Sequence, residues 1–207
     1  MKNEDNLKDK NITTEEKKEK KTVRRNSTNR KKPVKTNKTG KNNGGEELKQ
    51  DTGSSKLKII PLGGLEQIGM NITAFEYEDS IIVVDCGLSF PEDDMYGIDL
   101  VIPDVTYLKD NIDKVKGFFI THGHEDHIGA IPYVLKDVNV PIYATKLTIG
   151  IIEHKLKEHN MLTKVKRKVV KYGQHINLGC FRVEFIKTNH SIQDAAALAI
   201  YSPAGIV

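Results

Sequence analysis

Three histidines and two acidic residues stand together between an apolar segment and a segment with helical spacing. The apolar segment is residues 117–121 (GFFIT), and the polar run is residues 122–127 (HGHEDH). Residues 117–121 have the length and composition of a buried strand. Ile128–Lys136 repeats its apolar residues at helical spacing, with Pro132 early enough for a first turn. A loop that joins a buried strand to a helix is typical of layered α/β folds, which place ligand sites at strand ends.

The residue types of this loop predict a metal site. Neutral imidazoles and carboxylates are ligands that zinc prefers. Gly123 lets the backbone turn so that His122 and His124 converge, while Asp126 and His127, at the start of the helix, can serve a second ion. The alternative is a polar loop in which Asp126 caps the helix. Three histidines with an acid at this spacing favour metal binding, with zinc preferred and manganese possible.

Two further residues are candidates for the same site. His190 follows the strand-like segment Phe181–Lys187, so we expect it at another strand end, as a further ligand or as a surface loop histidine. Asp85 ends the apolar run 81–84; it either accepts an N–H from a ligand histidine and fixes its tautomer or forms a turn. Cys86 is expected to be a small buried hydrophobe rather than a ligand. Solvated or structural roles are expected for His154, His159 and His175.

The remaining pattern alternates short apolar runs with turns and helical segments. Two further helices are expected, at Asp104–Asn111 and Thr145–Glu158, and a long loop at Pro91–Pro103. Together with the segment 117–121, the expected strands are Lys56–Pro61, Asn71–Tyr77, Ile81–Asp85, Val140–Ala144, Arg167–Lys171, Phe181–Lys187 and Ala195–Ser202. This mixture predicts an α/β (α+β) layered fold.

Charge separates the first part of the chain from the rest. Residues 1–58 hold 18 Lys and Arg against 9 Asp and Glu, with no aromatic residue, whereas residues 59–207 hold 14 against 19. A chain as polar as the first part cannot bury enough apolar surface to offset its ordering entropy. We therefore predict a disordered basic tail over 1–57 and one folded unit over 58–207. The tail either contacts a phosphate backbone or is a mobile, solubilising extension.

Several protein classes are disfavoured by the sequence. It has no run of about 18 apolar residues, as a membrane helix requires, and no apolar segment near Met1 that resembles a secretory signal. Its two cysteines make no disulfide framework, which favours a reducing compartment. We expect a cytoplasmic protein without a membrane partner.

His-x-His-x-Asp-His after a buried strand resembles the metallo-β-lactamase superfamily. More narrowly, residues 59–207 resemble the ribonuclease J family, which is bacterial and belongs to the β-CASP branch. Gln193 departs from that family, which usually has proline at this position. The segments that carry the resemblance are 61–71 (PLGGLEQIGMN), 84–87 (VDCG), 97–104 (GIDLVIPD), 122–130 (HGHEDHIGA) and 190–195 (HSIQDA).

The resemblance implies a fold and a set of ligands. The fold would be an αββα sandwich of which this chain holds the N-terminal half. A bridging Asp, a later His ligand, the β-CASP domain and a C-terminal domain would all lie beyond Val207. His122, His124 and His190 would hold one zinc ion. Asp126 and His127 would hold a second and would be the catalytic residues.

The resemblance also implies an activity. It would be RNA cleavage, 5′-to-3′ exonuclease with endonuclease activity, in rRNA maturation and mRNA decay. RNA would be the partner, with a homo-oligomer or a paralogous subunit possible. Because a ligand and the substrate channel would be missing, we expect residues 1–207 alone to have little or no activity.

Two other functions stay open at this stage. Another hydrolase of the superfamily would act on thioesters, lactones or β-lactams, and a non-catalytic remnant would only bind a partner. No residue is assigned to nucleic-acid binding, because the folded part is net acidic and the Lys164–Lys171 cluster is typical of a solvated strand edge.

Overall fold

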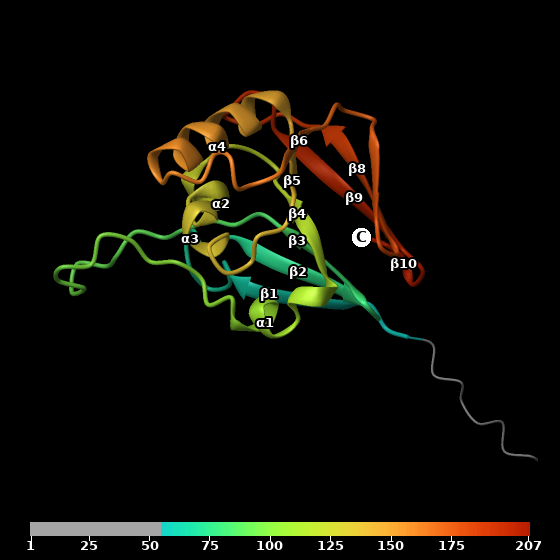
Figure 1. Cartoon of the computed structure of the whole chain (residues 1–207), viewed down its shortest axis with the longest axis horizontal. Coiled ribbons are helices and arrows are strands. Elements are labelled where there is room, and N and C mark those ends of the chain that lie inside the picture. Colours follow the sequence, from blue (N-terminus) through green and yellow to red (C-terminus); the bar gives the residue numbers. More distant parts are fainter. Residues whose placement is uncertain (1–54) are drawn as a thin grey trace, which may run out of the picture. The chain divides into compact units, whose positions relative to one another are not determined.

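A computed structural model describes residues 55–207 of the chain. The predicted basic tail covers 1–57, and its residues 1–54 lie outside the described residues. Within 55–207 the chain forms a layer of helices, a six-stranded sheet and a four-stranded sheet, with the first sheet in the middle (Figure 1). The predicted layered α/β fold is confirmed.

The six strands of the first sheet are ordered as they occur in the sequence. The pairs β1–β2 and β2–β3 are antiparallel, and the pairs from β3 to β6 are parallel. The carboxyl ends of β3, β4 and β5 therefore lie at the same end of the sheet. The strands are β1 (Lys58–Gly63), β2 (Ile72–Tyr77), β3 (Ser80–Val84), β4 (Val115–Phe119), β5 (Ile142–Ala144) and β6 (Arg167–Val169).

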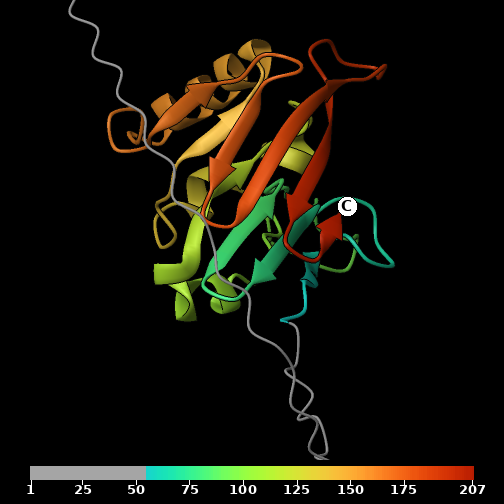
Figure 2. The same ribbon diagram turned by 90° about the vertical axis from the view of Figure 1, so that its right-hand side faces the viewer.

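The second sheet is antiparallel, in the order β10-β9-β8-β7, and faces the viewer in Figure 2. Its core strand β8 buries alternate residues, Phe181, Val183 and Phe185, against the first sheet. Between the sheets the Phe119 ring stacks on Tyr143 at 5.1 Å and lies 6.1 Å from Phe185, measured between ring centroids. The strands are β7 (His175–Leu178), β8 (Phe181–Lys187), β9 (Ala196–Ser202) and β10 (Gly205–Ile206).

The strand β7 was not predicted from the sequence. We expected no strand after His175, but that residue pairs with Glu184 and Leu178 pairs with Phe181. The four-residue run is too short for alternation alone to identify a strand, and pairing with β8 decides its conformation.

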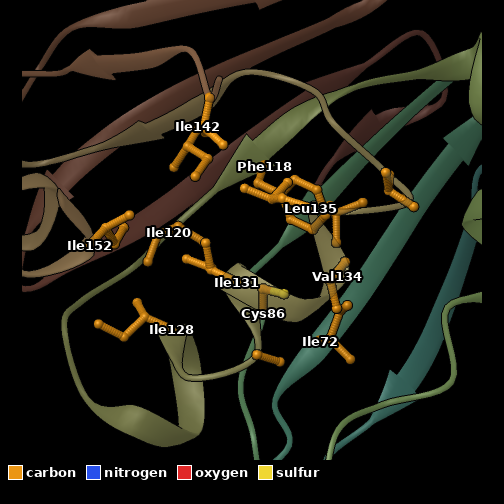
Figure 3. Packing of buried hydrophobic residues seen from close by; sticks show 14 of the residues in the cluster. Ile72, Cys86, Phe118, Ile120, Ile128, Ile131, Val134, Leu135, Ile142 and Ile152 are labelled. Atoms are coloured by element: carbon orange, nitrogen blue, oxygen red, sulfur yellow. The ribbon is translucent and has the colours of Figure 1, made fainter. Parts of the chain in front are cut away.

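Helices cover the other face of the first sheet. Their apolar side chains, among them Ile128, Ile131 and Ile152, pack on the strand residues Phe118 and Ile142 (Figure 3). The helices are α1 (Thr106–Asp110), the 3-10 turn η1 (Ile112–Lys114), α2 (Glu125–Ile128), α3 (Ile131–Val134) and α4 (Lys146–Glu158). No helix within 55–207 is long and apolar enough to cross a membrane.

The helix predicted over Ile128–Lys136 is shorter in the structure: α3 covers only Ile131–Val134, and the residues just before it form a separate short helix, α2. The carbonyl of Asp126, which would accept from Ala130 N–H in a continuous helix, accepts instead from Asn71 N–H at 3.0 Å. Ala130 N–H donates to the Cys86 carbonyl at 3.0 Å. Tertiary hydrogen bonds therefore interrupt the helix beside the histidine loop.

Candidate metal centre

Three predicted ligands come together where strands of both sheets end. His122 and His124 follow β4, and His190 follows β8. One ligand atom from each ring can be chosen so that all three lie within 4.8 Å of one another. Since His122 and His190 are far apart in the sequence, the packing of the two sheets brings them together.

His122 is the centre of this group and is 7 % exposed. Its Nε2 lies 3.1 Å from His124 Nδ1 and 3.1 Å from His190 Nε2. Burial, together with the neighbouring His127, His190 and His124, lowers the pKa of His122 to about 4. The ring is therefore neutral at pH 7 and offers a lone pair, as a metal ligand must.

Thr121 fixes which nitrogen of His122 faces the group. Its hydroxyl lies 2.9–3.0 Å from both carboxylate oxygens of Asp85 and 2.9 Å from His122 Nδ1. When the hydroxyl donates to Asp85, its oxygen accepts the Nδ1–H of His122, and Nε2 carries the lone pair. Sequence reasoning did not single out Thr121, although its place between the strand and His122 was a usable signal.

Asp126 and His127 form a second group beside the first. His127 Nε2 lies 3.3 Å from Asp126 Oδ2, and the rings of His122 and His127 are 4.0 Å apart between centroids. His124 is the N-cap residue of α2, and no side-chain capping bond is made, so Asp126 is not the cap that the alternative interpretation required.

Asp85 lies behind both groups. It is buried, follows β3, and adopts a left-handed φ of 60°, a conformation that costs free energy for a residue other than glycine. Its Oδ2 is 2.7 Å from His127 Nδ1, and its Oδ1 accepts the backbone N–H of Thr121 at 2.8 Å. Burial opposes charge on His127, but the hydrogen bond and the charge of Asp85, with a further contribution from Asp126, raise its pKa.

Asn71 is the other residue at the site that sequence reasoning passed over. Its side-chain Nδ2 lies 3.1 Å from Asp126 Oδ2 and 3.2 Å from His127 Nε2. It belongs to the segment 61–71 that carries the family resemblance, but nothing in that segment indicates which atoms it meets.

The remaining candidates lie elsewhere. Cys86 is buried in the core, as expected, and burial raises the pKa of its thiol. His154 pairs with Glu158 at 3.2 Å on an exposed part of α4, and His175 lies 3.9 Å from Glu184. A hollow of about 420 Å³ opens beside His190, and its lining includes Lys187, Asn189 and Gln193.

The donor set fits divalent metal ions. Three imidazoles, one of them held neutral by burial, converge within reach of one ion, and a carboxylate–imidazole pair lies next to them. Asp85 and Thr121 supply the outer hydrogen bonds that orient ligand histidines in metal sites.

Comparison with known proteins agrees with this chemistry. The family model described as the metallo-beta-lactamase superfamily matches residues 68–189. The chain is 47 % identical over 162 residues to a ribonuclease J of Synechocystis sp., covering 77 % of this chain and 25 % of that protein. It is 44 % identical over 151 residues to ribonuclease J 1 of Streptococcus pyogenes, covering 73 % of this chain and 27 % of that protein. The chain thus spans about a quarter of the length of these relatives.

Solved structures share the fold. A protein of unknown function from Enterococcus faecalis has a TM-score of 0.58 at 22 % identity, covering 73 % of this chain and 42 % of its own. The metallo-beta-lactamase fold protein YhfI of Bacillus subtilis has a TM-score of 0.50 at 18 % identity, covering 74 % and 61 %. At these identities the likeness concerns the fold alone.

Proposed function

The chain belongs to the metallo-beta-lactamase superfamily, and on this premise we propose that it forms the metal-binding part of a hydrolase that cleaves RNA phosphodiesters. The observation that carries the proposal is the convergence of the His122, His124 and His190 rings from two sheets. The RNA substrate is supported by 42–47 % identity to proteins named ribonuclease J.

The two groups divide the ligands between them. His122, His124 and His190 would hold one ion, and Asp126 and His127 would contribute to a second, with zinc preferred over manganese because imidazole dominates the set. Ions bound there supply Lewis acidity, which lowers the pKa of water to about 7 and neutralises charge that develops on a phosphate.

The chain's own residues prepare this site. Thr121 holds His122 with Nε2 toward its neighbours, and Asp85 holds His127 through Nδ1. Asp126, whose side chain is 42 % exposed, lies at the solvent side of the pair and is the carboxylate that can accept a proton from an incoming nucleophile. The hollow beside His190 gives a polar approach for a phosphate, with Lys187 on its wall.

The finer activity follows the family resemblance. We infer 5′-to-3′ exonuclease and endonuclease action on RNA in rRNA maturation and mRNA decay, in the cytoplasm, within a homo-oligomer or beside a paralogous subunit. Residues 1–207 alone are expected to have little or no activity, because the Asp126–His127 group brings two ligand side chains where a zinc ion usually has four ligands.

The test compares two substrates and two proteins. The 207-residue chain and the longest product of its gene, both loaded with zinc, are incubated with 5′-monophosphorylated RNA and with a thioester. The longer product should cleave RNA only, and His124→Ala should abolish cleavage, whereas the control His154→Ala on exposed α4 should not. Thioester hydrolysis without RNA cleavage would favour the other hydrolase, and retained activity in His124→Ala would remove that ring from the site.

A further inference from the structure

Asn71 is fixed by its backbone between two segments of the site. Its N–H donates to the Asp126 carbonyl at 3.0 Å, and its carbonyl accepts from Gly87 N–H at 3.0 Å. Met70, just before it, has a left-handed φ of 50°, which turns the chain at this point. The main-chain bonds therefore fix the backbone of Asn71 beside the histidine loop, independently of its side-chain contacts.

The side-chain amide then meets three acceptors on the histidine loop. Nδ2 lies 3.1 Å from the Asp126 carbonyl, 3.1 Å from Asp126 Oδ2 and 3.2 Å from His127 Nε2. An amide nitrogen has two protons and accepts nothing, so it can serve two of these acceptors at a time. When the neutral His127 ring donates its Nδ1–H to Asp85, its lone pair is on Nε2 and faces the amide.

We propose that Asn71 is a positioning residue for the second ion: its amide holds Asp126 Oδ2 and His127 Nε2 toward one point and releases them when an ion binds. The inference rests on the proposed function, since it assigns a second ion to this pair. It concerns Asn71, which the family resemblance assigns no role.

The physical reason is the mobility of an exposed carboxylate. The Asp126 side chain is 42 % exposed, while that of His127 is 20 % exposed and already held by Asp85. Apart from Asn71, only the His127 ring lies within hydrogen-bond or ion-pair distance of the Asp126 carboxylate among the described residues. Asn71 restricts the rotamers of this carboxylate before an ion binds. Ion binding therefore costs less side-chain entropy than it would with a freely rotating carboxylate.

Asn71 could instead only hold the histidine loop in place through the Asp126 carbonyl. The two roles differ in what an alanine substitution changes. If Asn71 only holds the loop, the substitution would disturb the whole loop and hence the His122, His124 and His190 group as well. A positioning residue affects the second ion and leaves the first nearly unchanged.

The experiment is a zinc titration of the 207-residue chain against a chromophoric chelator, together with ¹⁵N spectra of the histidine rings in the metal-free chain. In Asn71→Ala the second ion should bind about 2- to 10-fold more weakly, because ion binding must then order one side chain that Asn71 no longer holds in advance. The affinity of the first ion should change less than that, because Asn71 contacts none of its three ligands. The Nε2 resonance of His127 should shift, and that of His122 should not.

Two further variants complete the test. Asn71→Ser replaces the alanine variant if that variant fails to fold. The serine side chain is too short to reach both acceptors, so the same loss of affinity is expected. Asn139→Ala is the matched control, because Asn139 donates to the Lys164 carbonyl at 3.2 Å on an exposed part of the chain. A wild-type chain that binds a single ion, an equal loss at both sites, or an unchanged His127 resonance would overturn the proposal. Failure of His124→Ala to weaken the first ion would instead contradict the proposed function.

Discussion

The carboxylate of Asp85 contacts His127 directly and His122 through the Thr121 hydroxyl, so one buried side chain orients a ring in each ligand group. The direct contact, Oδ2 to Nδ1, is 2.7 Å. Because Asp85 follows β3 and the rings lie in the loop after β4, the parallel pairing of these strands places Asp85 beside both groups.

Asp85→Asn should weaken zinc binding about 10- to 100-fold. The asparagine keeps the size of the side chain, but an amide placed toward His127 Nδ1 donates where Asp85 accepts. The ring would then carry its proton on Nε2, the nitrogen that an ion needs. The measurement is a zinc competition titration, with Asp137→Asn as control, since Asp137 forms only an exposed ion pair with Lys109. Equal affinities in wild type and Asp85→Asn would contradict this role.

Gly87→Ala should destabilise the chain strongly. A Cβ at this position would lie 1.6 Å from the Asp126 carbonyl oxygen and 2.9 Å from Asn71 N, both backbone atoms that cannot move aside alone. Thermal unfolding and soluble yield would show the effect. Gly150→Ala on α4 is the control, because nothing lies within 4 Å of its Cβ position. Wild-type stability in Gly87→Ala would mean that the contact between these loops is looser than described.

Phe185→Ala should lower the free energy of unfolding by about 3–5 kcal/mol, because the side chain is fully buried between the sheets and leaves a cavity. Urea unfolding followed by circular dichroism measures the change. Ile186→Ala is the neighbouring control on β8; its side chain is 44 % exposed, so we expect a change within about 0.5 kcal/mol. Similar losses in both variants would argue against the two-sheet packing.

Glu76→Gln should make stability less dependent on pH in the acid range. Burial alone would raise the pKa of Glu76, but hydrogen bonds from Tyr107, Lys58 and Lys114 outweigh burial and lower it from 4.5. A depressed pKa in the folded state contributes stability above the unfolded pKa, and this contribution is lost as the pH falls through the folded pKa.

At pH 7 the Gln variant should therefore be less stable by about 1.5–3 kcal/mol, the range for hydrogen bonds to charged groups. The difference should shrink at pH 3. Urea unfolding across this range checks it, with the exposed Glu78→Gln as control. A constant difference at both pH values would show that the charge of Glu76 is not the cause.

The sequence carried enough information to predict the layers and the position of the histidine loop. Continuous apolar strands such as β3, and the alternation of Phe181, Val183 and Phe185, are local patterns that burial enforces. The break between α2 and α3 could not be predicted in this way, because it depends on Asn71, more than 50 residues away, taking the Asp126 carbonyl. The strand β7 likewise depends on its partner β8.

For the site, the sequence indicated residue types but not partners. The histidines, Asp126 and Asp85 were candidates because imidazole and carboxylate are metal ligands or their supports. Asn71 and Thr121 were not, since amides and hydroxyls are common in loops and act here only through what they contact.

The three rings of the first group come from both sheets: two follow β4 and the third follows β8. An ion shared by them would link the two sheets. This link would add to the Phe119–Phe185 packing and could form only when both sheets are assembled. Loading the chain with metal would then raise its free energy of unfolding, by about 2.7 kcal/mol at a hundredfold excess of free ion over the dissociation constant, and would raise its melting temperature accordingly. A chelator would therefore remove the ion and weaken the contact between the two sheets at the same time.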